Sequence, residues 1–568
     1  MMRLIVDGFT LDLGQNAKVR IKRQSPAYLG SGVGVIKGDF SFPFDLPLTG
    51  VNRVALGFPD RLDNDERPRV NLPAELYVGP DRLIGGVLNV LSASRTTAKV
   101  ALINHPLQDL TKVKLNDIDY GEINVASETE LRNLMDATTV SPEDHDYIFL
   151  PVFNLALRES TGLTDVPVDS EFQNPYDFNG RTFRTNHDVS PFLRTQVVLQ
   201  KAMAHAGYTI IDKLHALPEL RRMVLLNNRS MRLGDDLALK MPLNFCVNDQ
   251  TVADFIKQLC RIFCLAPFAG VGDNVIRLES LRGLVAAEPG GDWTNYASKE
   301  YSRENFDGGV SRFEYPESAY GDSYHYDYWE YDLKETTGVL RDFVDENDDI
   351  IPVPPGEIFY LEGRSAVSER RIFGENGALV PIGSFGRVFN EFGTEILAPS
   401  LFPAQSAHVF FYPTNFDRIT VPSVAWSVSG ITSEEEAGQS IIYSAVDNTQ
   451  TRLSIYRGFQ NTIQNVQYPM GCHNNYDSKF EEIESDVVSL NWLGNDGLYN
   501  RYWREWDAML QRSAAVSQSF LLPLAEVLDF DFSKKVRVGN QNYFVRSLEF
   551  TVTTRGVSPA QCELLSVS

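Results

Sequence analysis

Cysteine and histidine are the first candidates for chemistry, because a thiolate is a nucleophile and both residue types bind metals. Cys260 and Cys264 are one helical turn apart and form one candidate pair of metal ligands. They also continue an apolar stripe over residues 252–263, which favours buried structural thiols. Cys472 and His473 form a second candidate pair, but adjacent residues rarely converge on one ion and no Cys/His group has zinc spacing. We therefore expect no metal and no cofactor.

Two segments rich in one residue type suggest binding instead. Residues 345–349 are acidic, but they lack the spaced Asp residues and the distal Glu of an EF-hand, so a solvated acidic loop is the favoured interpretation. Residues 324–331 alternate tyrosine with other residues. They are candidates for stacking sugars or bases, although tyrosine at period two is more often one packed face of a strand.

The sequence singles out no catalytic residue. Carboxylates are numerous, so a glycosidase pair is not excluded, but no spacing identifies one. A glycine-rich phosphate loop, a Gly-x-Ser-x-Gly elbow and a His-Glu-x-x-His motif are all missing from the chain. We therefore predict a protein that is not an enzyme, with no catalytic, cofactor-binding or metal-binding residues.

Composition limits the class of protein. The chain has 568 residues, which predicts about 3 to 5 domains. Hydrophobic residues make up 43% and charged residues 22%, as in a soluble globular protein. The 34 Phe and 23 Tyr, with frequent Gly and Pro, favour many short strands and turns. The formal charge of −23 argues against a general nucleic-acid binder, but it is compatible with a channel wall that must not retain DNA.

Targeting signals are not evident. The N-terminus has no apolar core of signal-peptide length, and no run of about 18 apolar residues predicts a membrane span. Five irregularly spaced cysteines make a disulfide framework improbable and favour synthesis in a reducing compartment. We expect assembly in a cytoplasm and no stable membrane insertion.

The elements expected near the N-terminus are mainly strands. Residues 1–125 alternate apolar and polar positions between turns such as Asp7-Gly8, and they predict a β-barrel or sandwich. Within residues 37–62, Phe40, Phe42 and Phe44 alternate with polar residues around Pro43. Because proline cannot donate to a ladder, we expect a strand at an edge or bulge there, followed by a turn.

Residues 126–185 have a weak pattern and predict a long surface connection. Residues 186–285 contain two similar helix-then-strand units and predict an α/β insert. The first helix is expected from Ser190-Pro191 as its N-cap to Gly207, and the second from Asn248 or Asp249 to the residues before Pro267.

The remaining chain is predicted to be β-rich again. Residues 286–490 form a second β-rich region, and 14 Asp or Glu against 4 Lys or Arg occur in residues 301–350. Residues 491–568 predict a last helix followed by a β-meander that packs back on the other β domains, with Tyr502, Trp503 and Trp506 at the seam. The only long helices are expected near residues 191–206, 250–264 and 498–512.

Two sequence motifs resemble those of a known family. Residues 38–52, in the order G-x-F-S-F-P-F-x-L-P-L-T-x-x-N, and residues 492–499, followed by Tyr502, Trp503 and Trp506, resemble tail or baseplate hub proteins of phages and prophages of Bacteroidota. The resemblance covers about the first 100 and the last 90 residues. It implies a mainly β, tail-hub-like architecture with two β-barrel domains that mimic a sixfold tail tube, and helix-strand units that project from them.

The resemblance also implies a function and partners. It implies a structural virion protein, a homotrimeric ring at the tail tip or baseplate that joins the tube to the spike or tip and leaves a channel for DNA ejection. Partners would be further copies of the chain, the tail tube or distal tail protein, the tip or spike protein and the tape measure protein, with DNA only in transit. Two alternatives stay open: a receptor- or glycan-binding tail protein, suggested by residues 324–331, and a tail-associated cell-wall hydrolase.

Overall fold

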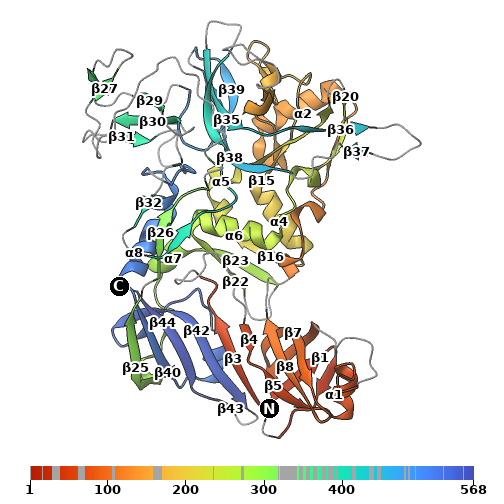
Figure 1. Ribbon diagram of the computed structural model, residues 1–568, viewed down its shortest axis with the longest axis vertical. Helices are drawn as coiled ribbons and strands as arrows, with labels where there is room; N and C mark the ends of the chain where they lie inside the picture. The colour runs from red at the N-terminus through yellow and green to blue at the C-terminus, as the bar shows by residue number, and fades with distance from the viewer. Residues whose placement is uncertain are drawn as a thin grey trace.

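The protein is described from a computed structural model (Figure 1). The structure describes all residues except 1, 16, 28–38, 62–70, 105–108, 158–168, 234–235, 270–273, 307, 317–318, 320–341, 345–349, 353–357, 363–367, 374–378, 382–384, 386–387, 391–392, 412–416, 434–440, 444–448, 463, 479–481, 484–486, 493, 529, 554–555 and 568. Both binding candidates of the acidic region, residues 324–331 and 345–349, lie outside the described residues.

One sheet of 15 strands joins the two ends of the chain, in the order β2-β1-β6-β7-β8-β4-β3-β42-β44-β40-β25. It forms the lower part of Figure 1, with the other elements above it. Its N-terminal strands are β1 (Met2–Val6), β2 (Phe9–Leu11), β3 (Lys18–Gln24), β4 (Asp39–Ser41), β5 (Phe44–Pro47), β6 (Leu72–Val78), β7 (Asp81–Ala93) and β8 (Thr97–Asn104). Its C-terminal strands are β24 (Gly291–Asp292), β25 (Ala297–Asn305), β40 (Ala514–Phe520), β41 (Val536–Val538), β42 (Gln541–Thr553), β43 (Gly556–Val557) and β44 (Ala560–Val567).

The alternation of side chains explains why these segments form a sheet with one buried face. In β3, Val19 and Ile21 are fully buried while Lys18 and Arg20 face outward. The pairing of β3 with β42 matches this period, because Ile21 lies opposite the buried Phe550. The predicted mainly β class is confirmed.

The Phe40–Leu48 segment differs from its prediction in detail. Proline interrupts the strand: β4 ends at Ser41 and β5 begins at Phe44, after Pro43. However, β4 lies between β3 and β8 inside the sheet and not at its edge. The expected turn after Pro47 is a short helix, α1 (Gly50–Ala55), which is capped by the Thr49 side chain.

The predicted surface connection at residues 126–185 is wrong in part, because it contains a long helix. Helix α2 (Glu128–Val140) has Ser127 as its N-cap and buries Leu131 and Met135. The Glu130 side chain accepts a hydrogen bond from the backbone N–H of Ala126, one residue before the N-cap, so Ser127 and Glu130 cap the helix start in a variant of the capping box. Short strands follow: β10 (Tyr147–Ile148), β11 (Val152–Asn154), β12 (Phe172–Gln173), β13 (Tyr176–Asp177) and β14 (Thr182–Phe183).

The two predicted helix-strand units are present and lie side by side. Helix α4 (Thr195–His205) precedes β16 (Thr209–Asp212), and α6 (Val252–Phe263) precedes β22 (Leu265–Ala269) and β23 (Val275–Ser280). Strands β16 and β23 pair in parallel, and β22 completes a three-stranded sheet. The predicted apolar stripe of α6 is confirmed as buried, and the helix begins after Thr251, whose side chain accepts from the Asp254 backbone.

The predicted start of α4 at Ser190-Pro191 is wrong. Residues 192–194 form strand β15 (Phe192–Arg194), because Leu193 pairs both with Tyr147 of β10 and with Leu225 of β17. Strand β15 belongs to the sheet β10-β15-β17-β38-β39, whose other members are β17 (Met223–Asn227), β38 (Thr451–Asn461) and β39 (Gln467–Cys472). This sheet crosses the predicted boundary at residue 285, and the domain boundaries stay predictions.

The remaining elements are short. The helices are α5 (Pro218–Arg221), α7 (Leu281–Ala286), α8 (Arg504–Arg512) and α9 (Leu524–Leu528). The strands are β9 (Glu122–Asn124), β18 (Arg229–Ser230), β19 (Arg232–Leu233), β20 (Asp236–Leu237), β21 (Lys240–Pro242), β26 (Val310–Phe313), β27 (Asp342–Val344), β28 (Ile350–Pro352), β29 (Ile358–Glu362), β30 (Ser368–Phe373), β31 (Leu379–Pro381), β32 (Val388–Phe389), β33 (Glu395–Leu397), β34 (Gln405–Phe411), β35 (Asp417–Val424), β36 (Ser429–Ser433) and β37 (Ile441–Tyr443). No helix among the described residues is long and apolar enough to cross a membrane.

Helix α8 connects the upper elements to the large sheet. A π-helical turn at Tyr499–Trp503 leads into α8. Trp503 is fully buried and its Nε1 donates to the Arg261 carbonyl oxygen of α6 (3.1 Å). Trp506 is fully buried and packs on Phe544 of β42, with ring centroids 5.2 Å apart. One continuous hydrophobic core therefore extends from the α/β elements into the sheet.

Candidate functional site: the outer face and free edges of the large sheet

The outward-facing residues of the large sheet form one continuous face. Arg20 and Lys22 of β3 lie opposite Thr551 and Glu549 of β42. On the same face, β44 contributes Gln561 and Glu563, and β40 contributes Ser517 and Ser519. The strand pairing shows that the same face continues through β4, β8, β7 and β6 to β1. In β1, Arg3 lies opposite Tyr77 and Ile5 lies opposite Glu75.

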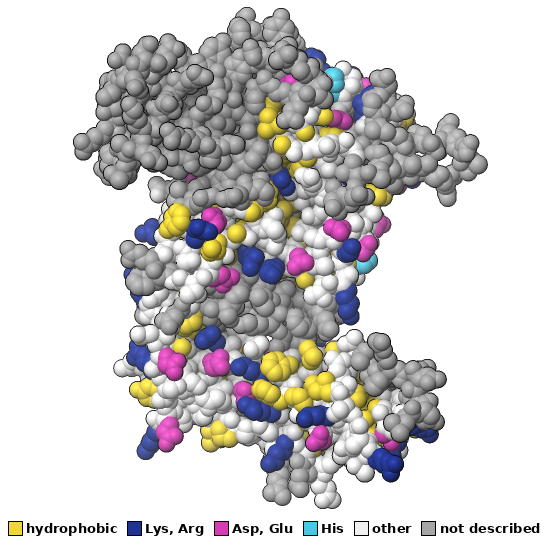
Figure 2. All heavy atoms as spheres, viewed as in Figure 1, with side chains coloured by type: hydrophobic (Ala, Val, Ile, Leu, Met, Phe, Trp, Pro, Cys, Tyr) yellow, Lys and Arg dark blue, Asp and Glu magenta, His cyan; other side chains and the backbone are white. Residues whose placement is uncertain are grey.

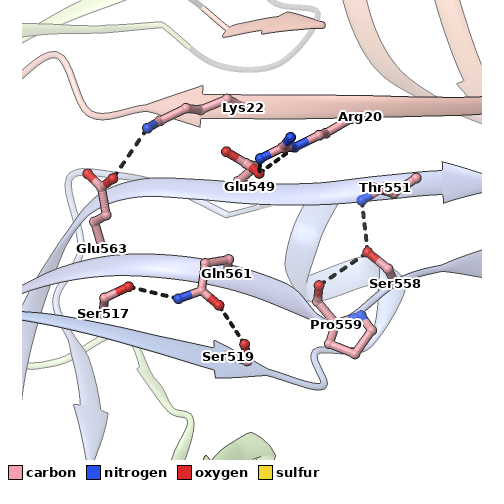
Figure 3. A network of polar contacts seen from close by, with 10 residues as sticks. All are labelled: Arg20, Lys22, Ser517, Ser519, Glu549, Thr551, Ser558, Pro559, Gln561 and Glu563. Atoms are coloured by element: carbon pink, nitrogen blue, oxygen red, sulfur yellow. Dashed lines mark hydrogen bonds and ion pairs between the residues drawn. The ribbon is translucent and has the colours of Figure 1, made fainter. Parts of the chain in front are cut away.

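Polar contacts link the C-terminal strands across this face, as Figure 3 shows. Arg20 forms an ion pair with Glu549, and the Lys22 Nζ lies 3.3 Å from Glu563 Oε1. The Ser519 hydroxyl donates to Gln561 Oε1 (2.5 Å), and Gln561 Nε2 donates to the Ser517 hydroxyl (2.8 Å). Burial raises the pKa of Glu563, but the Lys22 charge, the hydrogen bonds from Ser547 and Lys22 and the Arg546 charge together outweigh it, so the pKa lies below its usual range.

A second polar cluster lies on the N-terminal half of the face. Glu75 accepts hydrogen bonds from the Tyr77 hydroxyl (2.8 Å) and from Arg82 Nη1 (2.8 Å), and both lower the pKa of Glu75. The Arg3 guanidinium lies 4.7 Å from the centre of the Tyr77 ring. Each carboxylate in the two clusters is therefore matched by a basic neighbour. Figure 2 likewise shows basic and acidic side chains interspersed over the lower part of the molecule in that view.

The sheet ends in two open edges. At one end, β25 pairs only with β40 among the described strands, and Tyr301 in its middle is 65% exposed. At the other end, β1 is the only partner of β2 in the part of the chain that the structure describes, and Phe9 is 43% exposed. Val51 and Val54 of the adjacent helix α1 are also exposed. In Figure 1 these edges lie at the left and right ends of the lower sheet. Such edges carry backbone groups that are ready to pair with another chain.

The structure does not support a chemical role for the first cysteine pair, Cys260 and Cys264. Cys260 lies in α6 and Cys264 caps it in the left-handed conformation, and both thiols are buried. Burial raises the pKa of Cys260 to about 12 and that of Cys264 well above its ordinary value. Neither thiol is therefore a nucleophile near neutral pH. Among the residues that the structure describes, no group of three His, Cys, Asp or Glu side chains could hold a metal.

Cys472 and His473 are also fully buried, on opposite sides of the chain. The Cys472 thiol donates to the Asn474 carbonyl oxygen (2.9 Å), whereas His473 Nδ1 accepts from the Ser406 backbone N–H (2.9 Å). Burial and the charge of Arg457 lower the pKa of His473 to about 3, so the ring is neutral at physiological pH. In the neutral ring, the lone pair of Nδ1 accepts the hydrogen bond from Ser406, and Nε2 carries the proton. Neither nitrogen therefore has a free lone pair for a metal.

One arrangement that can do chemistry was not found from the sequence. The Thr195 hydroxyl lies 2.9 Å from His215 Nε2, and His215 Nδ1 lies 2.5 Å from Asp212 Oδ2. Hydrolases arrange a nucleophile, a base and an orienting acid in this order. Thr195 has no solvent exposure and its hydroxyl also contacts the Met223 carbonyl oxygen (3.2 Å), so no substrate can reach it. The relay fixes the start of α4 to the turn after β16; only the Asp-x-x-His spacing hints at it in the sequence.

Comparison with known proteins gives weak likenesses. No family model and no curated protein sequence matches the chain. The 43 kDa tail protein of prophage MuSo2 from Shewanella oneidensis has 7% identity and a TM-score of 0.33, over 99% of this chain and 97% of that chain. The tail protein from Neisseria meningitidis MC58 has 7% identity and a TM-score of 0.33, over 100% of this chain and 96% of that chain. At these values, neither likeness indicates what the chain does.

Proposed function

We propose that the chain is a structural component of a phage tail, the central hub of a tail tip or baseplate. The observation that carries the proposal is the 15-stranded open sheet, in which N-terminal and C-terminal strands meet through β3 and β42 and, among the described residues, an edge is free at each end. One subunit of this kind supplies two neighbouring segments of a ring wall. The sequence motifs at residues 38–52 and 492–499 resemble those of hub proteins and support the same proposal.

The ring closes by pairing unlike edges. Strand β25 of one copy adds to the β2–β1 edge of the next, and Tyr301 packs against Phe9 and the exposed valines of α1. A contact between two different surfaces generates a closed ring when the rotation between copies closes. The resemblance implies three copies. Each copy would supply an N-terminal and a C-terminal half of the large sheet, so six halves would surround the axis, which matches the sixfold symmetry of a tail tube.

The charge of the outer face fits the lining of a channel. Several of its basic residues are paired with carboxylates on neighbouring strands, as for Arg20 with Glu549 and Arg82 with Glu75. DNA binding requires clustered basic groups that replace counterions on phosphates, and paired arginines offer few of them. In this role the chain joins the tail tube or distal tail protein on one side to the tip or spike on the other. The tape measure protein and the DNA pass only through the channel.

The test is the oligomeric state of purified variants, measured by native mass spectrometry. Wild type is expected as a trimer, and Tyr301→Asp and Phe9→Asp, at opposite edges, are each expected to give monomers. Phe389→Asp is the control, because Phe389 is an exposed aromatic residue (67%) in β32, which belongs to a different sheet. A monomeric wild type, or edge variants that stay trimeric, would refute the ring.

A further inference from the structure

A cavity of about 260 Å³ lies between α5 and β38. Its lining residues are far in sequence from the two edge strands of the large sheet. Figure 1 shows α5 beside β38 in the upper part of the molecule. Apolar and aromatic groups make part of its wall, and polar groups make the rest: Pro218, Glu219, Arg222, Tyr456, Arg457, Asn475, Ile483 and Val487.

The first indication of a ligand is a buried positive charge. Arg457 is only 9% exposed, and its guanidinium donates to the carbonyl oxygens of Asn474 (2.8 Å) and Val488 (2.6 Å). No carboxylate oxygen of the described residues lies within 4.0 Å of it, although the charge of the buried Asp496 acts on it from farther away. A buried charge with no counter-ion in direct contact is costly, and an anion in the adjacent cavity would offset that cost.

The second indication is a second guanidinium on the same cavity. Arg222 is held loosely, since its Nη2 lies 3.6 Å from Glu143 Oε1, which is beyond normal hydrogen-bond length. Two arginines that line one cavity match a carboxylate, because a guanidinium can donate two parallel hydrogen bonds to its oxygens.

The other wall residues narrow the class of ligand. Glu219 is an acceptor for hydroxyl groups, and the Tyr456 ring with Ile483 and Val487 offers an apolar surface. A single peptide carboxylate would leave much of the volume empty and would leave Glu219 without a donor. We propose that this cavity binds an acidic sugar residue, with its carboxylate on Arg222 and Arg457 and its hydroxyls toward Glu219. The proposal is independent of the ring.

The experiment is calorimetric titration of the full chain with sodium glucuronate as the probe, with glucose and N-acetylglutamate as comparison ligands. Glucuronate is expected to bind saturably and glucose not to bind. Arg222→Gln is expected to weaken glucuronate binding by about tenfold or more, since it removes a charge-assisted pair. Arg221→Gln is the matched control, because Arg221 also approaches Glu143 (3.8 Å) but does not line the cavity.

Three results would overturn the proposal. The first is the absence of saturable glucuronate binding by wild type. The second is equal affinity of wild type and Arg222→Gln, which would place the ligand elsewhere. The third is tighter binding of N-acetylglutamate than of glucuronate, which would assign the cavity to an acidic peptide.

Discussion

Asp507 of α8 offers the sharpest test of the packing between this helix and the three-stranded sheet β32-β26-β33 beside it. Its side chain is 1% exposed, and no basic group pairs with it among the described residues. Oδ2 accepts hydrogen bonds from the Tyr499 hydroxyl (3.0 Å), Asn390 Nδ2 (2.8 Å) and Gln511 Nε2 (3.0 Å). Oδ1 has no partner in the part of the chain that the structure describes. Burial raises the pKa of Asp507 to about 6, although the three hydrogen bonds lower it.

The raised pKa fixes the sign of the effect on stability. An acid with a higher pKa in the folded state binds its proton more tightly there, so stability falls as pH rises from 3.8, the ordinary value, to about 6. A shift of about two pKa units corresponds to about 3 kcal/mol. Asp507→Asn keeps an oxygen acceptor and removes the charge. We expect it to increase the unfolding free energy by up to about 3 kcal/mol at about pH 7.5, and to change little near pH 4.

The assay is thermal unfolding of wild type and Asp507→Asn at both pH values, followed by tryptophan fluorescence. The expected result is a higher apparent Tm for the variant at neutral pH and coincident curves under acid conditions. A variant that is less stable than wild type at neutral pH would show that the carboxylate stabilises the fold. An equal gain at both pH values would show that the effect does not arise from ionisation.

Three further predictions concern buried groups. Burial alone would raise the pKa of Asp212, but the contact with His215 lowers it. Asp212→Asn should therefore reduce the Tm at neutral pH, and this reduction should become smaller as the pH falls below about 4. A higher Tm of the variant at neutral pH would contradict this. Trp506→Ala should cost about 3 to 5 kcal/mol and reduce trimer formation, with Trp506→Phe much milder; an unchanged Tm would place the helix outside the core. The five thiols are buried and should react with a thiol reagent only after unfolding, so labelling of the native protein would refute this.

Local patterns predicted elements best where one face of an element decides its burial. The apolar stripe of α6 repeats at helical spacing, so the sequence alone indicated which residues are buried. Helix α2 was missed because few of its residues are apolar and only Leu131 and Met135 carry its buried face beside two threonines. Its capping box at Ser127 and Glu130 was the available signal.

Tertiary pairing overrode local signals at the start of α4. Ser190-Pro191 has the form of a helix N-terminus, but Ser190 is fully buried and its backbone N–H donates to Asn174 Oδ1 (2.8 Å). The next three residues are held between β10 and β17, so the helix starts only after Arg194. The cavity at Arg222 and Arg457 was also beyond prediction, because these residues are 235 positions apart and meet only through the pairing of β17 with β38.

The pairing of β3 with β42 shows what a local pattern leaves undetermined. A period-two strand is compatible with any partner of the same period, and these strands are more than 500 residues apart in the chain. The ion pairs of Arg20 and Lys22 with Glu549 and Glu563 are partly exposed, and such pairs contribute about 0 to 1 kcal/mol each. A slip of one residue would instead turn Lys22 toward the core and Ile21 toward water, and burying an unpaired charge costs several kcal/mol. Burial of Val19 and Ile21 therefore sets the register, and the charged ladder follows from it.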